Sequence, residues 1–565
     1  MKQKQRVKIL SLLLSIFLLI SIFAGCGQKE APIDDSQKQT EQPEKPAENK
    51  DQEQTPTESE ESDVPEYLNA EGFPIVKEPI TLKGFGEKNV SHADWNEMLV
   101  FQEYEKMTNI KIEWNTPPVQ GYQEKKNVLL ASGDIPDIFY RANLSPTDEV
   151  VYGTQGVLIP LNDLIDKYAP NIKALFEKYP EIKKSITQPD GNIYSLPQAT
   201  DSLATRVQKN WINKKWLDNL NLDVPTTIDE YYEVLKAFRD KDPNGNGQKD
   251  EIPVTDAGKG NRMFAQLIGS WGLGNKGTSG VNPPYVDLGP DGNLRFYPID
   301  PRYKEVLEFI NKLYAEGLLD NMVFVLESPE FTAKGDQGII GGFFNGNSSE
   351  IIGQKYMEDY VAVPALKGPY GDQLWGDVQG TVQATGTFAI TNTCKYPEAA
   401  IRWIDYFYSE EGVRLLRMGV EGVTYTKLPD GGYQISEDFT NNPDGLSFPQ
   451  AMGRISPWPG GGVPQFILEE HEKVRLHQSC FDGAEIVKAY LPDEVWKFTF
   501  TAEEIDQLTA LQSDIHTYVE EMRVKFVIGE EPLSNWDNYV NTIQKMGLDE
   551  LMKIYEKAYE RWKNN

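Results

Sequence analysis

The chain has 565 residues, of which 39% are hydrophobic, and its 56 basic and 86 acidic side chains give a formal net charge of −30. This length exceeds the needs of one hydrophobic core and predicts about three to four domain-sized units. A surface this acidic repels phosphate backbones, which excludes nucleic acid as a partner. With three cysteines and four histidines, the chain has too few of these residues for a disulfide framework or a zinc site.

The first 25 residues predict an export signal. Four basic residues precede an apolar run at 9–24, which is shorter than the roughly 20 residues of a membrane-spanning helix. The run ends in Phe23-Ala24-Gly25-Cys26, which resembles the bacterial lipobox, although Phe23 replaces the usual Leu. We therefore expect Cys26 to be diacylated and to anchor the protein to the extracellular face of the cell membrane. A plain secretory signal with an incidental cysteine is the alternative. Cys394 and Cys480 are expected to remain thiols.

Residues 26–78 are expected to form a disordered acidic tether. Between 26 and 65 the chain has 12 acidic residues against 4 lysines and scarcely an aliphatic one. So polar a segment buries too little apolar surface to offset its ordering entropy. Its charges repel one another and should keep it extended.

From residue 79 the hydrophobic pattern alternates between strand-like and helix-like segments. The first are a strand at 80–85, a helix at 95–110, a strand at 110–114, a helix at 122–130 and a strand at 137–140. This order favours parallel strands joined by right-handed crossovers, and hence an α/β fold. The later segments are a strand at 204–213, helices at 227–240 and 301–316, an apolar run at 339–344, a strand at 386–391 and a helix at 397–418.

The last hundred residues are expected to be mainly helical. A capping box at Thr501 and Glu504 opens a helix that Gly529 stops, and further helices follow at 534–546 and after Gly547. The glycine stops make packing helices a better interpretation than a coiled coil.

The strongest local motif predicts a calcium loop. Oxygen-bearing side chains occupy positions 1, 3, 5, 9 and 10 of an EF-hand-like pattern with Gly247 at position 6, and position 7 contributes its backbone oxygen. These ligands are Asp242, Asn244, Asn246, Gln248, Asp250 and Glu251. Pro253 stands at position 12, where an EF-hand has a bidentate Glu, and residues 252–254 are expected to be extended rather than helical. The motif is therefore half an EF-hand, and a structural Ca²⁺ is expected. A metal-free turn is the alternative; a dockerin would need a duplicate loop.

Six segments together resemble one family. They are LLASGDIPDIFY (129–140), GVLIPLNDLIDKYAPNI (156–172), DGNIYSLPQ (190–198), and the stretches 211–238, 388–422 and 526–561. The chain resembles the large bacterial extracellular solute-binding proteins, family 1, that feed ABC importers, especially sugar-binding lipoproteins related to alginate- and maltodextrin-binding proteins. The resemblance implies a two-lobe, periplasmic-binding-protein-like α/β fold with an inter-lobe cleft, and a monomer that binds a carbohydrate and importer permease subunits. By order, lobe 1 takes 79–200 and 358–455, and lobe 2 takes 201–357 and 456–565.

Aromatic rings and polar groups in loops are candidates for binding a sugar. Tryptophans in Gly-rich stretches lack periodic apolar neighbours, which places them in loops at a cleft mouth; they are Trp271, Trp375 and Trp458. The order of segments in maltodextrin-binding relatives implies further contacts from Tyr140, Arg141, Phe344 and Asn345, and Trp95 is a weaker candidate. Each ring has the alternative of a core position. Trp211, Trp216, Trp403 and Trp536 are expected in the core.

A lipid-anchored, secreted carbohydrate-active enzyme is the competing class, because a carboxylate pair would serve in a similar cleft. The sequence has no GxSxG, HExxH or Walker A motif, and His471 and His477 are expected on a solvated helix face. We therefore expect a binding protein and not an enzyme. Peptides or another non-sugar solute stay open as ligands.

Overall fold

The computed structural model describes residues 64–274, 285–429 and 431–564. The predicted export signal, Cys26 and most of the predicted tether lie outside the described residues. The end of that tether differs from the expectation, because Leu68, Ile75 and Val76 are buried. Tyr67 donates a hydrogen bond from its hydroxyl to Glu398 at 2.6 Å. The packed part of the chain therefore starts before residue 79.

A six-stranded sheet forms the centre of the first lobe, in the order β13-β4-β10-β3-β1-β2. Its strands are β1 (Ile80–Phe85), β2 (Ile110–Asn115), β3 (Ile138–Tyr140), β4 (Leu196–Thr200), β10 (Val382–Ile390) and β13 (Gln465–Ile467). β1 lies parallel to β2 and to β3, which confirms the predicted crossover connections. β10 is antiparallel to β3 and β4, and β13 is parallel to β4.

The second lobe contains a three-stranded sheet in the order β8-β5-β9, in which β5 is antiparallel to both neighbours. Its strands are β5 (Lys209–Asn213), β8 (Gly342–Asn345) and β9 (Tyr360–Ala362). Two small hairpins are formed by β6 (Val286–Leu288) with β7 (Leu294–Phe296), and by β11 (Tyr425–Lys427) with β12 (Tyr433–Ile435). β9 pairs with the second sheet and β13 with the first, so the expected lobe boundaries at 358 and 456 fall on the wrong side of these two strands.

Helices cover both sheets. Those before β5 are α2 (Leu99–Thr108), α3 (Tyr122–Ser132), α4 (Pro146–Thr154), α5 (Asn162–Tyr168), α6 (Pro170–Lys178), α7 (Pro180–Ile186) and α8 (Leu203–Arg206). Between β5 and β10 lie α9 (Lys214–Leu220), α10 (Ile228–Asp240), α11 (Asn261–Leu267), α12 (Pro301–Ala315) and α13 (Ser328–Gln337). After β10 come α14 (Pro397–Asp405), α15 (Glu410–Met418), α16 (Glu437–Thr440), α17 (Phe448–Met452), α18 (Glu469–Glu472), α19 (Gln478–Val487), α20 (Ala502–Ile528), α21 (Trp536–Lys545) and α22 (Leu548–Asn564).

Two predicted elements are divided in the structure. The strand expected at 204–213 begins as the short helix α8 and becomes β5 only at Lys209. The helix expected at 397–418 breaks into α14 and α15, because the Ser409 hydroxyl accepts the Gly412 N–H and caps the second helix.

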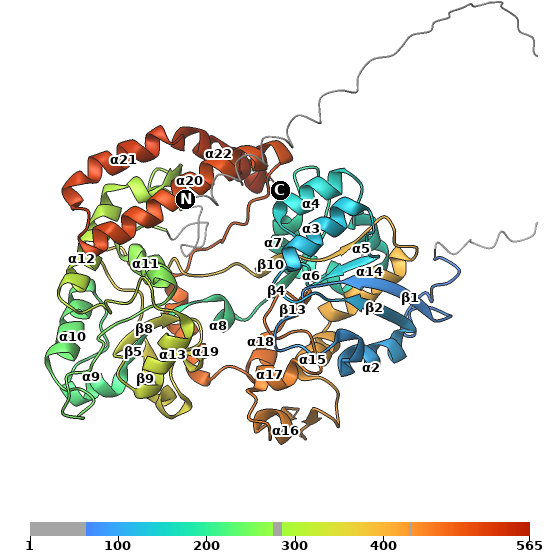
Figure 1. Cartoon of the computed structure of the whole chain (residues 1–565), viewed down its shortest axis with the longest axis horizontal. Helices are drawn as coiled ribbons and strands as arrows, with labels where there is room; N and C mark the ends of the chain where they lie inside the picture. The colour runs from blue at the N-terminus through green and yellow to red at the C-terminus, as the bar shows by residue number, and fades with distance from the viewer. Residues whose placement is uncertain (1–63, 275–284, 430, 565) are drawn as a thin grey trace, which may run out of the picture. The chain divides into compact units, whose positions relative to one another are not determined.

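The C-terminal helices pack on the second lobe, as predicted (Figure 1). Thr501 and Glu504 form the expected capping box of α20, which ends at Gly529 in a left-handed conformation. Apolar residues of α20 and α22, such as Ile515 and Leu551, share one core with Val306 of α12. A separate core of the first lobe surrounds Trp95, Tyr140 and Trp403.

Within the described residues the chain passes between the two sheets in three crossing segments, at 201–208, 363–381 and 468–477. The first two run side by side, since Gln208 N donates to the Asp377 carbonyl at 3.1 Å and Gln379 N to the Arg206 carbonyl at 2.8 Å. Crossing segments of this kind are the places where two lobes can rotate about a hinge.

Candidate ligand-binding site

Charged side chains follow the ends of two neighbouring parallel strands in the first lobe. Glu87 comes shortly after β1 and Arg141 directly after β3. Arg141 Nη1 lies 2.9 Å from Glu87 Oε1, and Asn143 donates to the other oxygen of that carboxylate at 3.2 Å. Burial lowers the pKa of Arg141, and the Glu87 charge partly offsets this shift. Carboxyl ends of parallel strands are where ligands bind in open α/β sheets.

A glycine-rich loop before β13 covers these strand ends. Gly460, Gly461 and Gly462 all have positive φ, a conformation that other residues rarely adopt. At Gly460 the positive φ strains any other residue, and an added Cβ would lie 2.4 Å from Asn89 Nδ2, so the Asn89 side chain would have to move. Arg141 Nε donates to the Gly461 carbonyl at 2.7 Å. Sequence reasoning treated this loop only as the bearer of Trp458, although its three consecutive glycines were the available signal.

The second lobe contributes a polar pocket of about 180 Å³. Asn345 at the end of β8 lines it together with Asn347, Gln208, Arg262 and Glu350. The Asn345 side chain accepts the Asn347 N–H at 2.8 Å, which fixes the turn after the strand. Gln208 Oε1 is buried without a hydrogen-bond partner. Amide and guanidinium groups at this pocket can donate hydrogen bonds to hydroxyl or carboxylate oxygens.

Buried ionisable groups lie around this pocket. Burial raises the pKa of Asp256 to about 7 and that of Asp377 to about 7. Asp377 accepts a hydrogen bond from Gln266 at 3.1 Å. Burial also lowers the pKa of Lys209 to about 8, and its ammonium donates to the Gly346 carbonyl at 3.0 Å. Lys209 thereby holds the backbone that connects Asn345 to Asn347.

The three candidate tryptophans are buried rather than exposed on loops. Trp271 lies in the second-lobe core, 5.7 Å from the Phe309 ring between centroids, and donates to Glu305. Trp375 packs in a small cluster with Val378 and Val487. Trp458 lies in the first-lobe core, with the Arg417 guanidinium 4.3 Å from its ring. Of the two positions expected for these rings, the structure supports the core position, because apolar partners come from distant segments; contact with a ligand stays a prediction.

The remaining candidates divide between core and site. Tyr140 and Trp95 are fully buried in one aromatic cluster of the first lobe, 5.8 Å apart between ring centroids. Phe344 is fully buried in the second lobe. Arg141 and Asn345 belong to the two polar groups described above. The four tryptophans expected in the core are buried, as predicted: Trp211, Trp216, Trp403 and Trp536.

His471 differs from its expected solvated position. It is 1% exposed, and burial lowers its pKa to about 4. His477 is partly exposed and caps α19 through its side chain. Both described cysteines, Cys394 and Cys480, are free thiols.

The predicted calcium loop follows α10, which opens with a capping box at Thr227 and ends at Asp240. The Asp242 carboxylate accepts the N–H groups of Asn246 at 3.1 Å and Gly247 at 2.8 Å. Asn246 Nδ2 donates to the Asp250 carboxylate at 3.1 Å, and Asn244 donates to the same carboxylate at 3.3 Å. Chain pairing at Ile252 and Val254 confirms an extended segment after the loop.

The environment of the Glu251 carboxylate indicates that these residues fit a cation. Its Oε1 is buried without a hydrogen-bond partner, and burial raises its pKa, with the negative charges of Asp250 and Asp242 raising it further. A divalent cation would relieve both effects. Across the described ranges, no three His, Cys, Asp or Glu side chains already lie close enough to hold a metal ion. The residues therefore fit Ca²⁺ in type and number, and binding would draw the side chains together.

A family model of the bacterial extracellular solute-binding proteins matches residues 89–414. The chain belongs to this family. It is 30% identical over 531 residues to the fructooligosaccharide ABC transporter substrate-binding protein FusA of Streptococcus pneumoniae serotype 4. The aligned region covers 89% of this chain and 94% of FusA. It is also 27% identical to lipoprotein LipO of Bacillus subtilis, over 81% of this chain and 88% of LipO.

Solved structures of the same family share the fold. FusA in complex with kestose matches with a TM-score of 0.71 at 28% identity, over 86% of this chain and 100% of that chain. A FusA EF-hand mutant in complex with fructo-nystose matches with a TM-score of 0.70 at 28% identity, over 86% of this chain and 100% of that chain. Alginate-binding protein AlgQ2 without calcium ion gives 0.67 at 25% identity, over 86% of this chain and 99% of that chain.

These matches confirm the predicted two-lobe fold and the predicted class. The protein is an extracellular substrate-binding component of an ABC importer, and it is not an enzyme. Within residues 64–274, 285–429 and 431–564, no helix has the length and apolar character needed to cross a membrane.

Proposed function

We propose that this protein captures an oligosaccharide between its two lobes and presents it to the importer. The observation that carries the proposal is that each lobe places polar groups at the end of a sheet strand, Glu87 and Arg141 after β1 and β3 in one and Asn345 at the end of β8 in the other. Carboxylate, guanidinium and amide groups bind sugar hydroxyls well. The names of FusA and AlgQ2, which state a fructooligosaccharide and alginate, support a saccharide.

Hinge closure supplies the mechanism. A ligand that contacts both lobes binds the closed form better than the open one, and this difference in affinity shifts the population toward closure. Arg141 and Lys209 hold backbone next to the two polar groups, so each lobe would present its groups in a fixed arrangement as the crossing segments rotate.

A thermal-shift screen tests this function. Kestose, nystose, maltotriose and oligogalacturonate are compared with a tetrapeptide at equal concentrations, because a ligand present at 100 times its Kd stabilises the folded state by about 2.7 kcal/mol. One saccharide class should raise the melting temperature, and Asn347→Ala should reduce the shift while the exposed control Asn441→Ala leaves it unchanged. Stabilisation by the peptide alone would contradict the proposal.

The calcium loop is proposed to hold one structural Ca²⁺ through side chains and the backbone oxygen of Gln248. The side chains are Asp242, Asn244, Asn246, Asp250 and Glu251. The ion would connect α10 to the extended segment that pairs with Ile340 and Phe343, and would thereby stabilise the second lobe without touching the ligand. The solved structures of a FusA EF-hand mutant and of AlgQ2 without calcium ion support a calcium-binding loop.

Cys26 is proposed as the lipid anchor of the protein. The small residues that precede it and the change of composition that follows support this assignment, as does the name of the lipoprotein relative LipO. A lipid anchor keeps the binding protein next to the importer permease subunits, which are its proposed partners, and we propose that it works as a monomer.

A further inference from the structure

A second pocket, of about 490 Å³, shares no lining residue with the polar pocket of the second lobe. It is bounded by α4 and α7 of the first lobe and by α20 and α22 of the C-terminal region. Residues 379–383 and 495–500 complete its walls. Its volume is within the range of small-molecule sites.

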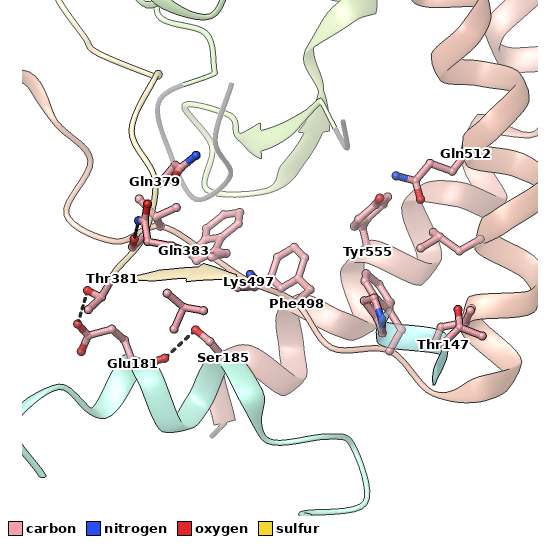
Figure 2. Close-up of a pocket in the computed structure, with 18 of the residues that line it drawn as sticks. Thr147, Glu181, Ser185, Gln379, Thr381, Gln383, Lys497, Phe498, Gln512 and Tyr555 are labelled. Atoms are coloured by element: carbon pink, nitrogen blue, oxygen red, sulfur yellow. Dashed lines mark hydrogen bonds between the residues drawn. The ribbon is translucent and has the colours of Figure 1, made fainter. Parts of the chain in front are cut away.

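Aromatic rings from two segments line this pocket. Trp496 and Phe498 stack with 5.5 Å between ring centroids, and Phe498 lies 6.3 Å from the Tyr555 ring of α22. Figure 2 shows Phe498 and Tyr555 on neighbouring sides of the open space. Trp496 and Tyr555 are buried, whereas Phe498 and Phe500 are half-buried, so the two phenylalanine rings can supply a surface on which a flat apolar face lies.

Amide and hydroxyl groups stand around the rings. Gln379 and Gln383 lie on one side of the pocket, and Gln512 lies beside Tyr555 on another (Figure 2). Gln383 donates to the Gly380 carbonyl at 3.0 Å, which leaves its amide oxygen to accept. These groups suit a ligand that offers many hydroxyls.

Glu181 and Lys497 are the charged side chains that line the pocket. Glu181 accepts a hydrogen bond from the Thr381 hydroxyl at 2.8 Å. Burial lowers the pKa of Lys497, an effect that the negative charge of Glu149 opposes. With one carboxylate and one ammonium on its walls, the pocket does not select for an anion or a cation.

We propose that this pocket is a second carbohydrate site, separate from the polar groups at Arg141 and Asn345, that binds a neutral saccharide of one or two rings. The sugar's C–H face would lie on Phe498, which is half-buried, while the glutamine amides bind its hydroxyls. A purely aliphatic ligand would leave these amides unpaired, which costs binding energy. The proposal does not rest on the proposed function, because it needs neither the cleft nor the importer.

The test is saturation-transfer NMR of the mature full-length protein with sucrose as the probe, and with galacturonate and hexanol as comparison probes. Two exposed or half-buried positions allow the pocket to be filled: Thr147→Trp on α4 and Gln512→Trp on α20. Gln507→Trp, also on α20 but exposed and outside the pocket, is the matched control. Asn347→Ala alters the second-lobe pocket. Circular dichroism and melting establish that each variant is folded.

Sucrose should bind, and its affinity should fall at least tenfold in each folded pocket variant while Gln507→Trp retains it. Loss of sucrose binding only in Asn347→Ala would assign the sugar to the cleft and overturn the proposal. It is also overturned if sucrose does not bind, or if galacturonate or hexanol binds at this pocket in its place. Failure of the oligosaccharide screen for the cleft leaves these outcomes unchanged.

Discussion

Arg141 and Glu87 form a buried ion pair, with Nη1 and Oε1 2.9 Å apart, immediately beyond the ends of two adjacent parallel strands. The same guanidinium donates to the carbonyls of Gly460 and Gly461, 319 and 320 residues away along the chain. The Arg141 side chain thereby connects the ends of β1 and β3 to the glycine-rich loop before β13.

Replacing Arg141 by Met should destabilise the protein by about 3 kcal/mol, because it leaves the Glu87 carboxylate buried and unpaired. Urea unfolding measures this loss. The double variant Glu87→Gln, Arg141→Met should recover part of it. Arg454→Met is the control, because its pair with Asp444 is exposed and should contribute less than about 1 kcal/mol. Equal effects at Arg141 and Arg454 would contradict the role of Arg141.

Truncating Trp271, Trp375 or Trp458 to Ala separates a core role from a binding role. A core tryptophan should cost about 3 to 5 kcal/mol of stability. A ring that anchors a sugar should cost about 2 kcal/mol of binding, roughly thirtyfold in affinity. We expect a large loss of stability at all three positions, measured by urea unfolding, and calorimetry on the folded variants decides binding. Unchanged affinity at a position removes that ring from the ligand site.

Chelation should lower the melting temperature, because a cation that binds only the folded state stabilises it by mass action. Asp242→Ala should melt like the chelated protein and should no longer respond to chelator or to added Ca²⁺. Differential scanning calorimetry at matched ionic strength measures both. If chelation abolishes ligand binding without changing melting, the structural role is wrong.

The pH dependence of stability should change in Asp377→Asn. The folded-state pKa of Asp377 is about 7 because of burial, whereas a free Asp titrates near 4. Between these values only the unfolded state has lost the proton, so wild-type stability falls as the pH rises from about 4 to about 7. Asparagine does not ionise. The variant should therefore gain about 2 to 4 kcal/mol relative to wild type across this window.

Urea unfolding at several pH values gives this difference. The pKa of Asp377 also depends on its neighbours Asp256, Arg262, Lys209 and Gln266. These residues are present in both proteins, so their contributions to the stability difference largely cancel. Asp291 serves as a control of opposite sign, because hydrogen bonds to Asn293 lower its pKa. A stability difference between wild type and Asp377→Asn that does not vary with pH would show that Asp377 is ionised throughout.

The mature protein should begin at Cys26 and carry a lipid. Cys394 and Cys480 should each be a free thiol and should each gain one alkyl group. Intact mass after detergent extraction and reduction measures this. Cys26→Ala should release the protein from the membrane fraction. An unmodified N-terminus elsewhere would favour the plain secretory signal.

Local patterns predicted the secondary-structure elements, whereas the contacts of the candidate site depend on distant segments. The strand β2, the helix α10 and the capping box of α20 are encoded within a few residues of each element, and their predictions are confirmed. Trp271 is different: it ends a short 3₁₀ helix, and its ring partner Phe309 lies on α12. No periodicity around Trp271 reveals that partner, so the sequence left a loop at the cleft mouth and a core position open as alternatives.

The polar groups of the site pose the same difficulty. Arg141 and Asn345 were found only through the order of segments in a known family. The contact of Arg141 with Gly461 depends on the final strand of the sheet, and Asn347 becomes a site residue only when the turn after β8 is known. These relationships arise from tertiary packing, which the pattern of one chain does not encode locally.

The pairing of β4 with β13 has a consequence for how the protein is made. The Thr200 hydroxyl donates to the Ile467 carbonyl across 267 residues, so the first sheet stays incomplete until most of the chain has been synthesised. Closing so long a loop makes folding slow. Until then β4 presents an unpaired edge that can recruit another strand. Chains cut short before residue 465 should therefore aggregate rather than accumulate as a folded first lobe.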